Sequence, residues 1–368
     1  PKHLLMVEND ANEKDTARIE DVGWEHPIGT GPFRFGERLA SGEVHLVRND
    51  RYFRGVPALD EWVYLPCRDV QEVLSGLREG GIDLARVSAQ ETRFFENDPN
   101  VTIIAAPGFE YYALMINASS PSLRDVTTRK ALAYAIDRPR LVQTLLDGYG
   151  QVIDSSWLPE HWANSVDAPL MPYDPAKAKE LLSQAGWEDS DGDHLLDRDG
   201  KPLQVDIAVN AEDTLRKQIA FAVQQNWLEI GVSTEVHFVE FYAFVEKLFS
   251  QTFDVAVFSW PLHADPDQSL LWASDESELL HDFDVIAYAN PVVDEALLAG
   301  LTAPSCDTGA RAQAYRQASD AITADQPYIF LFAPQQVLAT NHRLSGPRPG
   351  PYASLSWNVA DWALEPAP

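Results

Sequence analysis

The amino-acid sequence predicts an α/β fold on the basis of three observations. Beyond residue 203 the apolar residues change repeatedly between strand and helix periodicity, in the order strand–helix–strand–helix–strand. That order is typical of parallel strands covered by helices. Helix-capping residues are frequent upstream of this region. The 368 residues are 45% hydrophobic and 23% charged, which indicates a globular chain long enough for two or three domains.

The first third of the chain contains a predicted hairpin, a helix and a strand. Residues 33–48 alternate between apolar and polar side chains on either side of Ser41-Gly42, a pair typical of turns. Asp69 begins a helix that extends to about Gly80, with its apolar residues on one face. The apolar, aromatic segment 110–117 is predicted to be a strand.

Aspartates begin three predicted helices in the middle of the chain. Asp125 is the N-cap of the first, and Asp137 begins the second, which ends at Gly148. The third runs from Asp174-Pro175 to Gly186. Aspartate before a helix, proline in its first turn and glycine beyond its end match the known preferences of helix termini.

The second half of the chain supplies the alternating strands and helices. The predicted elements are strands at 203–209, 232–238, 253–260 and 328–332, helices at 215–230, 241–249 and 307–324, and an irregular Pro- and Gly-rich segment at 343–352.

Charge excludes two classes of partner. The chain has 28 Lys and Arg against 56 Asp and Glu, a formal net charge of −28, which disfavours nucleic acid and anionic membrane surfaces. Residues 1–20 contain no signal-peptide core and begin without Met, so we expect a processed or trimmed chain. Cys67 and Cys306 show no metal-binding spacing; two buried free thiols are the favoured interpretation, and a disulfide is the alternative.

Six short segments point to one family. They are PKHLL at 1–5, PIGTGPF at 27–33, NDRYFRGVP at 49–57, GID at 81–83, RKALAYAIDR at 129–138 and YDPAKAKELLSQAGW at 173–187. In these segments the chain resembles the extracellular solute-binding proteins of the peptide/nickel type, family 5, which serve ABC importers. The resemblance extends from the first residue to about residue 346.

The resemblance implies a periplasmic-binding-protein-like fold of type II, cluster C-like, in which crossing strands join two α/β lobes. Relatives carry a longer segment before the one that starts at Pro1, so we expect lobe I to be incomplete. The implied division is 1–110 for part of lobe I, 111–117 for the first hinge crossing, 118–329 for lobe II, and 330–368 for the return crossing and the rest of lobe I. The ligand would lie between the lobes and be trapped by their closure.

The implied function is the non-enzymatic substrate-binding component of an ABC importer. It would capture a peptide or related small molecule in the periplasm or outside the cell, in some arrangements as a membrane-tethered lipoprotein, and deliver it to the permease. Two alternatives remain open. One is a ligand-sensing receptor domain, and the other is a metal-dependent hydrolase, against which the absence of a nucleophile motif argues.

The loop that begins at Trp260 is the predicted ligand site, because ligands of parallel α/β layers meet the carboxyl ends of strands. Trp260 offers ring area, and Asp265 offers an ionic partner for a cation. In peptide-binding relatives an aspartate three residues after this tryptophan holds the ligand's ammonium group. Here that position is His263, so we expect no peptide N-terminus to be recognised there.

Four further side chains are ligand candidates. Tyr111, Tyr112 and Asn117 lie on the predicted crossing strand, where alternate side chains would face the ligand. Trp357 lies near the C-terminus. For the strand residues a core position is an equally good interpretation, and for Trp357 packing is the favoured one.

An acidic segment at 189–197 partly matches a calcium-binding loop. Asp189, Asp191, Asp193 and Asp197 occupy positions 1, 3, 5 and 9 of that pattern. The pattern lacks its Gly at position 6 and its Glu at position 12. A solvated acidic turn is therefore the favoured interpretation, with bound calcium as the alternative and no other cofactor expected.

Overall fold

The computed structural model describes residues 27–108, 110–164, 171–261, 263–274, 285–304, 307–350 and 355–365. The chain divides into two compact units, which are residues 1–106 with 337–368, and residues 107–336. The predicted first crossing at 111–117 and residues 330–336, where the predicted return crossing starts, lie inside the second unit, next to these two boundaries.

The described part of the first unit contains short antiparallel strands and the helix α3. The predicted hairpin is confirmed as β1 (Phe33–Arg38) and β2 (Val44–Arg48), with Gly42 at φ 95° in the turn. β3 (Glu61–Tyr64) pairs with β2 and was not predicted. The helix predicted after Asp69 is confirmed as α3 (Val70–Glu79), because the Asp69 side chain accepts the amide of Glu72 and caps it.

Two further strands of the first unit pair with β13 (Tyr328–Asn341), a strand that extends through both units. Its residues 337–340 pair with β4 (Leu84–Val87), and β5 (Val101–Pro107) also pairs with β13. A small core forms around Leu59, Leu344, Val359 and Trp362, next to the pair β14 (Leu344–Ser345) and β15 (Ala363–Leu364). The described residues of this unit also include the 3-10 helices η1 (Gln90–Phe95) and η4 (Val359–Asp361).

The second unit is built on a mixed sheet, which confirms the predicted α/β class. The strand order is β11 (Val236–Val239), β10 (Ile207–Asn210), β12 (Val255–Pro261), β6 (Glu110–Ile116) and β13, and β7 (Gly150–Val152) also pairs with β13. β10 is parallel to β11 and to β12, as predicted. β6 is antiparallel to both β12 and β13.

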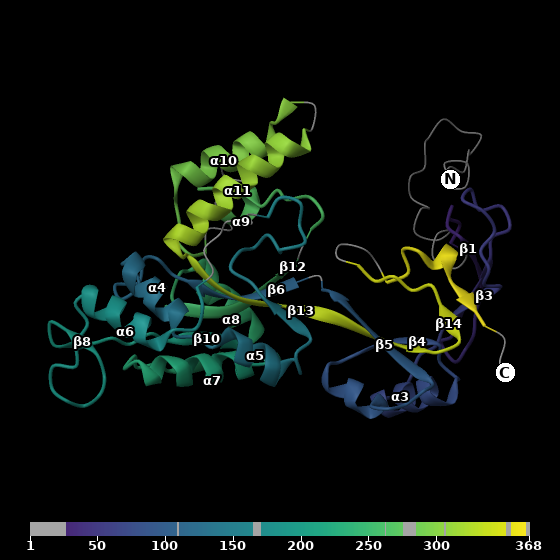
Figure 1. Ribbon diagram of the computed structural model, residues 1–368, viewed down its shortest axis with the longest axis horizontal. Coiled ribbons are helices and arrows are strands. Elements are labelled where there is room, and N and C mark those ends of the chain that lie inside the picture. The colour runs from purple at the N-terminus through teal and green to yellow at the C-terminus, as the bar shows by residue number, and fades with distance from the viewer. Residues whose placement is uncertain are drawn as a thin grey trace, which may run out of the picture. The chain divides into compact units, whose positions relative to one another are not determined.

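Helices cover this sheet on both faces, and each face has its own core (Figure 1). On one face lie α4 (Val126–Tyr134), α5 (Arg138–Leu145), α6 (Pro175–Gln184) and α7 (Thr214–Glu229). On the other lie α8 (Phe241–Phe249), α9 (Ser269–Trp272), α10 (Pro291–Leu301) and α11 (Thr308–Asp325). Successive side chains of β6 alternate between the two cores, as strand geometry requires.

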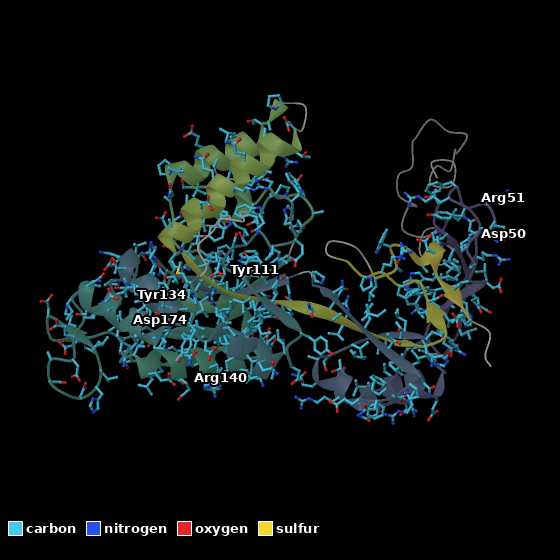
Figure 2. The ribbon with its side chains drawn as sticks, viewed as in Figure 1. Asp50, Arg51, Tyr111, Tyr134, Arg140 and Asp174 are labelled. Atoms are coloured by element: carbon cyan, nitrogen blue, oxygen red, sulfur yellow. The ribbon has the colours of Figure 1, made fainter. Side chains whose placement is uncertain are left out.

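Local capping explains where the helices of the second unit begin. The side chains of Asp125, Asp137 and Asp174 each accept a main-chain amide of the first helical turn, as predicted. The amide of Asp174 also donates to the carbonyl of Tyr134 at 2.8 Å, which connects the start of α6 to the end of α4 (Figure 2). Arg140 on α5 is exposed (Figure 2).

One predicted strand and one predicted thiol differ from the structure. The strand expected at 203–209 is paired as a ladder only from Ile207, and before it Gln204 forms an isolated parallel bridge with Ser233. The hairpin of β8 (Asp197–Arg198) and β9 (Lys201–Pro202) precedes this segment. The thiol of Cys67 is free but only half-buried, and Cys306 lies outside the described residues. No helix in the described part of the chain is long and apolar enough to span a bilayer.

Two buried arginines hold the second unit together through main-chain carbonyls. Arg129 donates to the carbonyl oxygens of Leu123, Arg124, Asp325 and Gln326. Arg138 donates to those of Ile153, Met171 and Phe330, and its Nη1 forms an ion pair of 2.6 Å with the buried Asp154. Both arginines therefore serve the scaffold.

Candidate ligand site

The carboxyl ends of the parallel strands meet at one edge of the second unit's sheet. β12 ends at Pro261 and β10 at Asn210, and the antiparallel β6 begins beside them at Glu110. In this register Trp260 is opposite Tyr111, and Ser259 is opposite Tyr112. Trp260 and Tyr111 point to the face covered by α8–α11, whereas Tyr112 points to the face covered by α7.

Trp260 is half-buried at this edge. Its ring centroid lies 5.0 Å from that of Phe258, and its Nε1 donates to the Tyr328 hydroxyl at 3.3 Å. The indole is thus held in one orientation by its own unit. A fixed aromatic ring with part of its surface open is a suitable contact for an apolar part of a ligand.

Tyr111 and Asn117 offer no open surface for a ligand beside Trp260. Tyr111 is only 1% exposed, with its ring 5.8 Å from Phe330, and burial raises the pKa of its hydroxyl well above the usual value. This is the core position that the sequence left open. Asn117 lies at the opposite end of the strand pair, because β6 and β12 are antiparallel.

The amide of Asn117 is engaged by its own chain. Nδ2 donates to the carbonyls of Gln251 and Phe253, each at 2.8 Å, and Oδ1 accepts from both the amide and the hydroxyl of Ser119. Asn117 lines a pocket of about 640 Å³ at the amino ends of the parallel strands. The structure therefore separates the three strand candidates that the sequence grouped.

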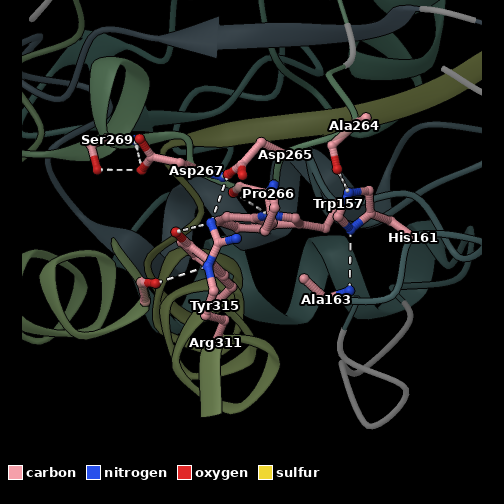
Figure 3. A network of polar contacts seen from close by, with 11 residues as sticks. Trp157, His161, Ala163, Ala264, Asp265, Pro266, Asp267, Ser269, Arg311 and Tyr315 are labelled. Atoms are coloured by element: carbon pink, nitrogen blue, oxygen red, sulfur yellow. Dashed lines mark hydrogen bonds and ion pairs between the residues drawn. The ribbon is translucent and has the colours of Figure 1, made fainter. Parts of the chain in front are cut away.

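Hydrogen bonds to residues 156–161 hold the segment after β12 in place (Figure 3). We call residues 263–268 the β12 loop. Trp157 Nε1 donates to the carbonyl of Pro266 at 2.9 Å, and His161 Nε2 lies 3.2 Å from that of Ala264. Gln268 Nε2 donates to the carbonyl of Ser156 at 3.3 Å. The main chain of the β12 loop is thus fixed by the segment 156–161.

Asp265 has a partner within the chain. Arg311 Nη2 donates to its Oδ1 at 2.8 Å, and this interaction holds the pKa of the Asp265 carboxyl below its usual value. Arg311 in turn donates from Nε to the carbonyl of Gly300. A ligand cation at Asp265 would therefore compete with Arg311, which the sequence did not foresee. His263 lies exposed on the same loop.

A polar cluster on the other side of the edge was missed from sequence. Arg216 Nη2 donates to Ser259 Oγ at 2.8 Å, and its Nε lies 3.2 Å from Oδ2 of Asp213, the N-cap of α7. The hydroxyl of Tyr112 belongs to this cluster, because Glu110 and Asp213 add to burial in raising its pKa and Arg216 opposes them. The signal in the sequence is the start of a helix directly after a parallel strand.

The acidic segment gathers three of its four aspartates. Carboxylate oxygens of Asp189, Asp191 and Asp193 lie within 4.8 Å of one another and are exposed. Each of the three also accepts a main-chain amide of the same turn. Asp197 is turned away, since its carboxylate accepts from the amide and hydroxyl of Ser190. Asp197 therefore does not complete the predicted ligand set.

Trp357 belongs to the first unit. It is 54% exposed, and its Nε1 donates to the carbonyl of Arg348 at 2.6 Å. All the other predicted ligand residues belong to the second unit.

Comparison with known proteins identifies the family. The family model described as bacterial extracellular solute-binding proteins, family 5 Middle, matches residues 4–278. The chain belongs to this family. The predicted resemblance is thereby confirmed. Similar curated proteins include the oligopeptide-binding protein AppA of Bacillus subtilis, at 31% identity over 99% of this chain and 66% of that protein. The glutathione-binding protein GsiB of Pectobacterium atrosepticum is 28% identical over 93% of this chain and 65% of that protein. This chain thus spans slightly less than two thirds of the length of these two relatives.

Solved structures agree with the fold. The structure of AppA from Bacillus subtilis in complex with a nonapeptide matches 92% of this chain and 67% of that one, with a TM-score of 0.67 and 30% identity. NikZ from Campylobacter jejuni, in complex with Ni(L-His), matches 99% of this chain and 72% of that one, with a TM-score of 0.71 and 28% identity. These solute-binding proteins have a mixed α/β two-lobe fold, which confirms the predicted fold class.

Proposed function

We propose that this solute-binding chain is the ligand-capturing part of an ABC importer's substrate-binding component. It takes up a peptide or related small molecule outside the cytoplasmic membrane and delivers it to the permease, without catalysis. Family membership supports this, as do the names of relatives that bind oligopeptides and glutathione. Location in the periplasm or outside the cell, with or without a lipid anchor, follows from the same proposal.

The observation that carries the proposal is the edge formed by the ends of β10 and β12. Trp260 presents a fixed, partly open indole there, and Arg216 presents a guanidinium. Nη2 of Arg216 donates to Ser259, and Nε lies 3.2 Å from Oδ2 of Asp213 without a hydrogen bond. Within the described residues Nη1 makes no hydrogen bond, and we propose that it binds a ligand oxygen. Carbonyl and carboxylate oxygens are what a guanidinium binds best, and peptides carry both.

Asp265 and His263 have lesser roles in this proposal. Asp265 fastens the β12 loop through Arg311 and is not the primary partner of a ligand cation. His263 is exposed and carries no fixed negative charge, so a peptide ammonium gains no ionic partner there.

The test uses a panel suggested by the relatives, namely a nonapeptide mixture, reduced glutathione and nickel–histidine. Isothermal titration calorimetry measures binding to the purified protein, and native mass spectrometry detects a co-purified ligand. We expect at least one member of the panel to bind. The absence of both binding and a co-purified ligand would contradict the proposal.

Variants at one helical turn identify the site. We expect Arg216→Gln to weaken binding by at least about tenfold, because a hydrogen bond to a charged group contributes about 1.5–3 kcal/mol. Lys217→Gln removes a neighbouring positive charge on α7 and is the matched control, with unchanged affinity. Equal affinities for Arg216→Gln and the wild type would remove Arg216 from the site.

A further inference from the structure

We infer that a pocket at the sheet edge that carries Trp260 is a subsite for a positively charged side chain of the ligand, such as that of lysine or arginine. The inference rests on the proposed function, because that function brings a ligand to this edge. It goes further by naming the charge of one ligand group and the residue that receives it, Glu160.

The pocket has a volume of about 250 Å³, and all its lining residues belong to the second unit. They come from the chain just before β6, the start of β7, the middle of β13 and the segment 156–161. Pockets that enclose a whole small molecule measure about 300–1,000 Å³. This pocket therefore has room for one part of a ligand, such as a single side chain.

Strand pairing places the pocket at the same edge as Trp260. β13 is antiparallel to both β6 and β7, so its residues 333–334 pair with the start of β7, at the end of the sheet where β6 begins and β12 ends. Leu158 and Ala333 of the lining belong to the core against which Trp260 packs, so the pocket and the indole share one face of the sheet.

The separation between the pocket and Trp260 suits a peptide. β6 alone stands between β12 and β13, so the two sites are about 10 Å apart across the sheet, which is two interstrand spacings. An extended peptide covers that distance in about three residues. One peptide could therefore contact the indole and fill the pocket together.

The polar groups of the pocket lack partners within the chain. Glu160 is the only ionisable side chain among the described residues that line it. No described residue forms a hydrogen bond or an ion pair with its carboxylate, nor with the side-chain amides of Gln151 and Gln335. A carboxylate and two amides thus converge on one small space with their hydrogen-bonding capacity open, which is the arrangement expected of a binding subsite.

The apolar part of the lining suits the stem of a basic side chain. Pro107, Leu158 and Ala333 supply apolar surface beside the carboxylate. Lysine and arginine bury their methylene stems on such surface while the charged end meets an oxygen ligand. An acidic side chain would instead meet Glu160 in a chain whose formal net charge is −28.

Other carboxylates near this edge are already engaged. Asp265 is paired with Arg311 at 2.8 Å, and Asp213 lies 3.2 Å from Arg216. A ligand cation would have to displace an arginine at either position, whereas at Glu160 it displaces only water. Glu160 is therefore the carboxylate that a basic side chain of the ligand gains most by contacting.

A probe that carries only the proposed group tests the pocket directly. n-Butylammonium has a lysine-like stem and charge, and n-butanol is its uncharged counterpart. In a titration followed by nitrogen-15 NMR, n-butylammonium should shift the main-chain amides of Gly108, Gly150 and Gln151 more than n-butanol does. Glu160→Gln should raise the apparent Kd of n-butylammonium by about fivefold, the upper end for an ion pair that water reaches.

Glu295→Gln is the matched control, because it removes a carboxylate from an exposed position on α10 and should keep the wild-type affinity. An absence of shifts at the three amides would overturn the inference. Equal affinities of Glu160→Gln and the wild type for n-butylammonium would overturn it as well.

A second experiment measures the preference of the pocket with peptides. The purified protein is incubated with the nonapeptide mixture, and mass spectrometry identifies the peptides that it retains. Retained peptides should be enriched by about fivefold in Lys or Arg over Glu at one position. Glu160→Lys reverses the charge of the pocket and should turn this preference toward Glu or Asp, while circular dichroism verifies that the variant is folded.

Glu295→Lys makes the same change in net charge away from the pocket and should keep the wild-type preference. A preference for basic residues that survives Glu160→Lys, or that Glu295→Lys reverses equally, would contradict the inference, because net charge would then attract the peptide. If no peptide is retained, the proposed function fails for peptides, and the n-butylammonium titration still decides the charge preference of the pocket.

Discussion

The ion pair between Asp265 and Arg311 can be separated from any role of Asp265 in ligand binding. Asp265→Asn removes the negative charge and keeps the shape of the side chain. Arg311→Met removes the guanidinium and keeps most of its aliphatic length. The two single variants and the double variant form a cycle that measures how strongly the pair is coupled.

The geometry gives the expected magnitudes. Asp265 is 61% exposed and Arg311 16%, so water screens their 2.8 Å contact, and the pair contributes about 0.2–1 kcal/mol. Arg311→Met also removes the hydrogen bonds to the Gly300 carbonyl and the Tyr315 hydroxyl, each of which contributes about 1 kcal/mol. We therefore expect Arg311→Met to lower the free energy of unfolding by about 2–3 kcal/mol, and Asp265→Asn by at most about 1 kcal/mol.

Acidity adds a second readout. Because Arg311 lowers the pKa of folded Asp265 below its ordinary 3.8, the ionised form stabilises the fold above that value. The coupling should be complete at neutral pH and should shrink as the pH falls through the lowered pKa. High salt should weaken it, since one partner is largely exposed.

Urea unfolding followed by circular dichroism measures the cycle, and calorimetry with a cationic peptide measures binding. The reasoning is refuted if Asp265→Asn abolishes binding of the cationic peptide with unchanged stability, because Asp265 would then serve the ligand. It is also refuted if Arg311→Met costs no more than Asp265→Asn.

Three further predictions concern the buried arginine, the tryptophan and the acidic turn. Arg138→Met leaves Asp154 buried without its cation and should lower the free energy of unfolding by about 3–5 kcal/mol in urea, whereas Arg140→Met at an exposed position of the same helix should change it by less than about 0.5 kcal/mol. Trp260→Ala should weaken ligand binding by about 1–2 kcal/mol in calorimetry, and Trp260→Phe by less, since a ring remains; equal losses would show that ring area is not what the ligand contacts. A chelator should leave the melting temperature unchanged, because the turn 189–193 satisfies its own amides; a higher melting temperature with calcium would establish a bound ion.

Helix starts were predictable because their cause is local. Asp69, Asp125 and Asp174 each cap a helix within four residues of themselves, so the signal lies in a short window of sequence. β3 escaped prediction because its side chains are mostly exposed, and its existence depends on pairing with β2. α10 escaped because the exposed apolar residues Val292, Leu298 and Leu301 obscure the helical period of its buried residues.

The site was predictable only in part, for a related reason. The rule that ligands meet strand ends led to Trp260 and the β12 loop. The partners that fix this loop, His161 and Arg311, lie about 100 and 50 residues away along the chain and carry no local signal. The positions of the candidates in 110–117 depended on strand geometry and pairing: Tyr111 and Tyr112 alternate between the two faces of the sheet, and Asn117 lies at the far end of the pairing with β12.

The two buried arginines, Arg129 and Arg138, stand at either end of RKALAYAIDR, one of the segments by which the family is recognised. Both arginines donate hydrogen bonds to main-chain carbonyls of the protein. Asp174, in the segment YDPAKAKELLSQAGW, caps the helix α6. In these two segments the three residues therefore serve the scaffold. Under the proposed function the ligand is bound elsewhere, at a strand edge whose residues lie outside the six segments. A lineage can thus exchange one cargo for another while every diagnostic segment stays intact, and a signature match alone will return proteins that carry different things.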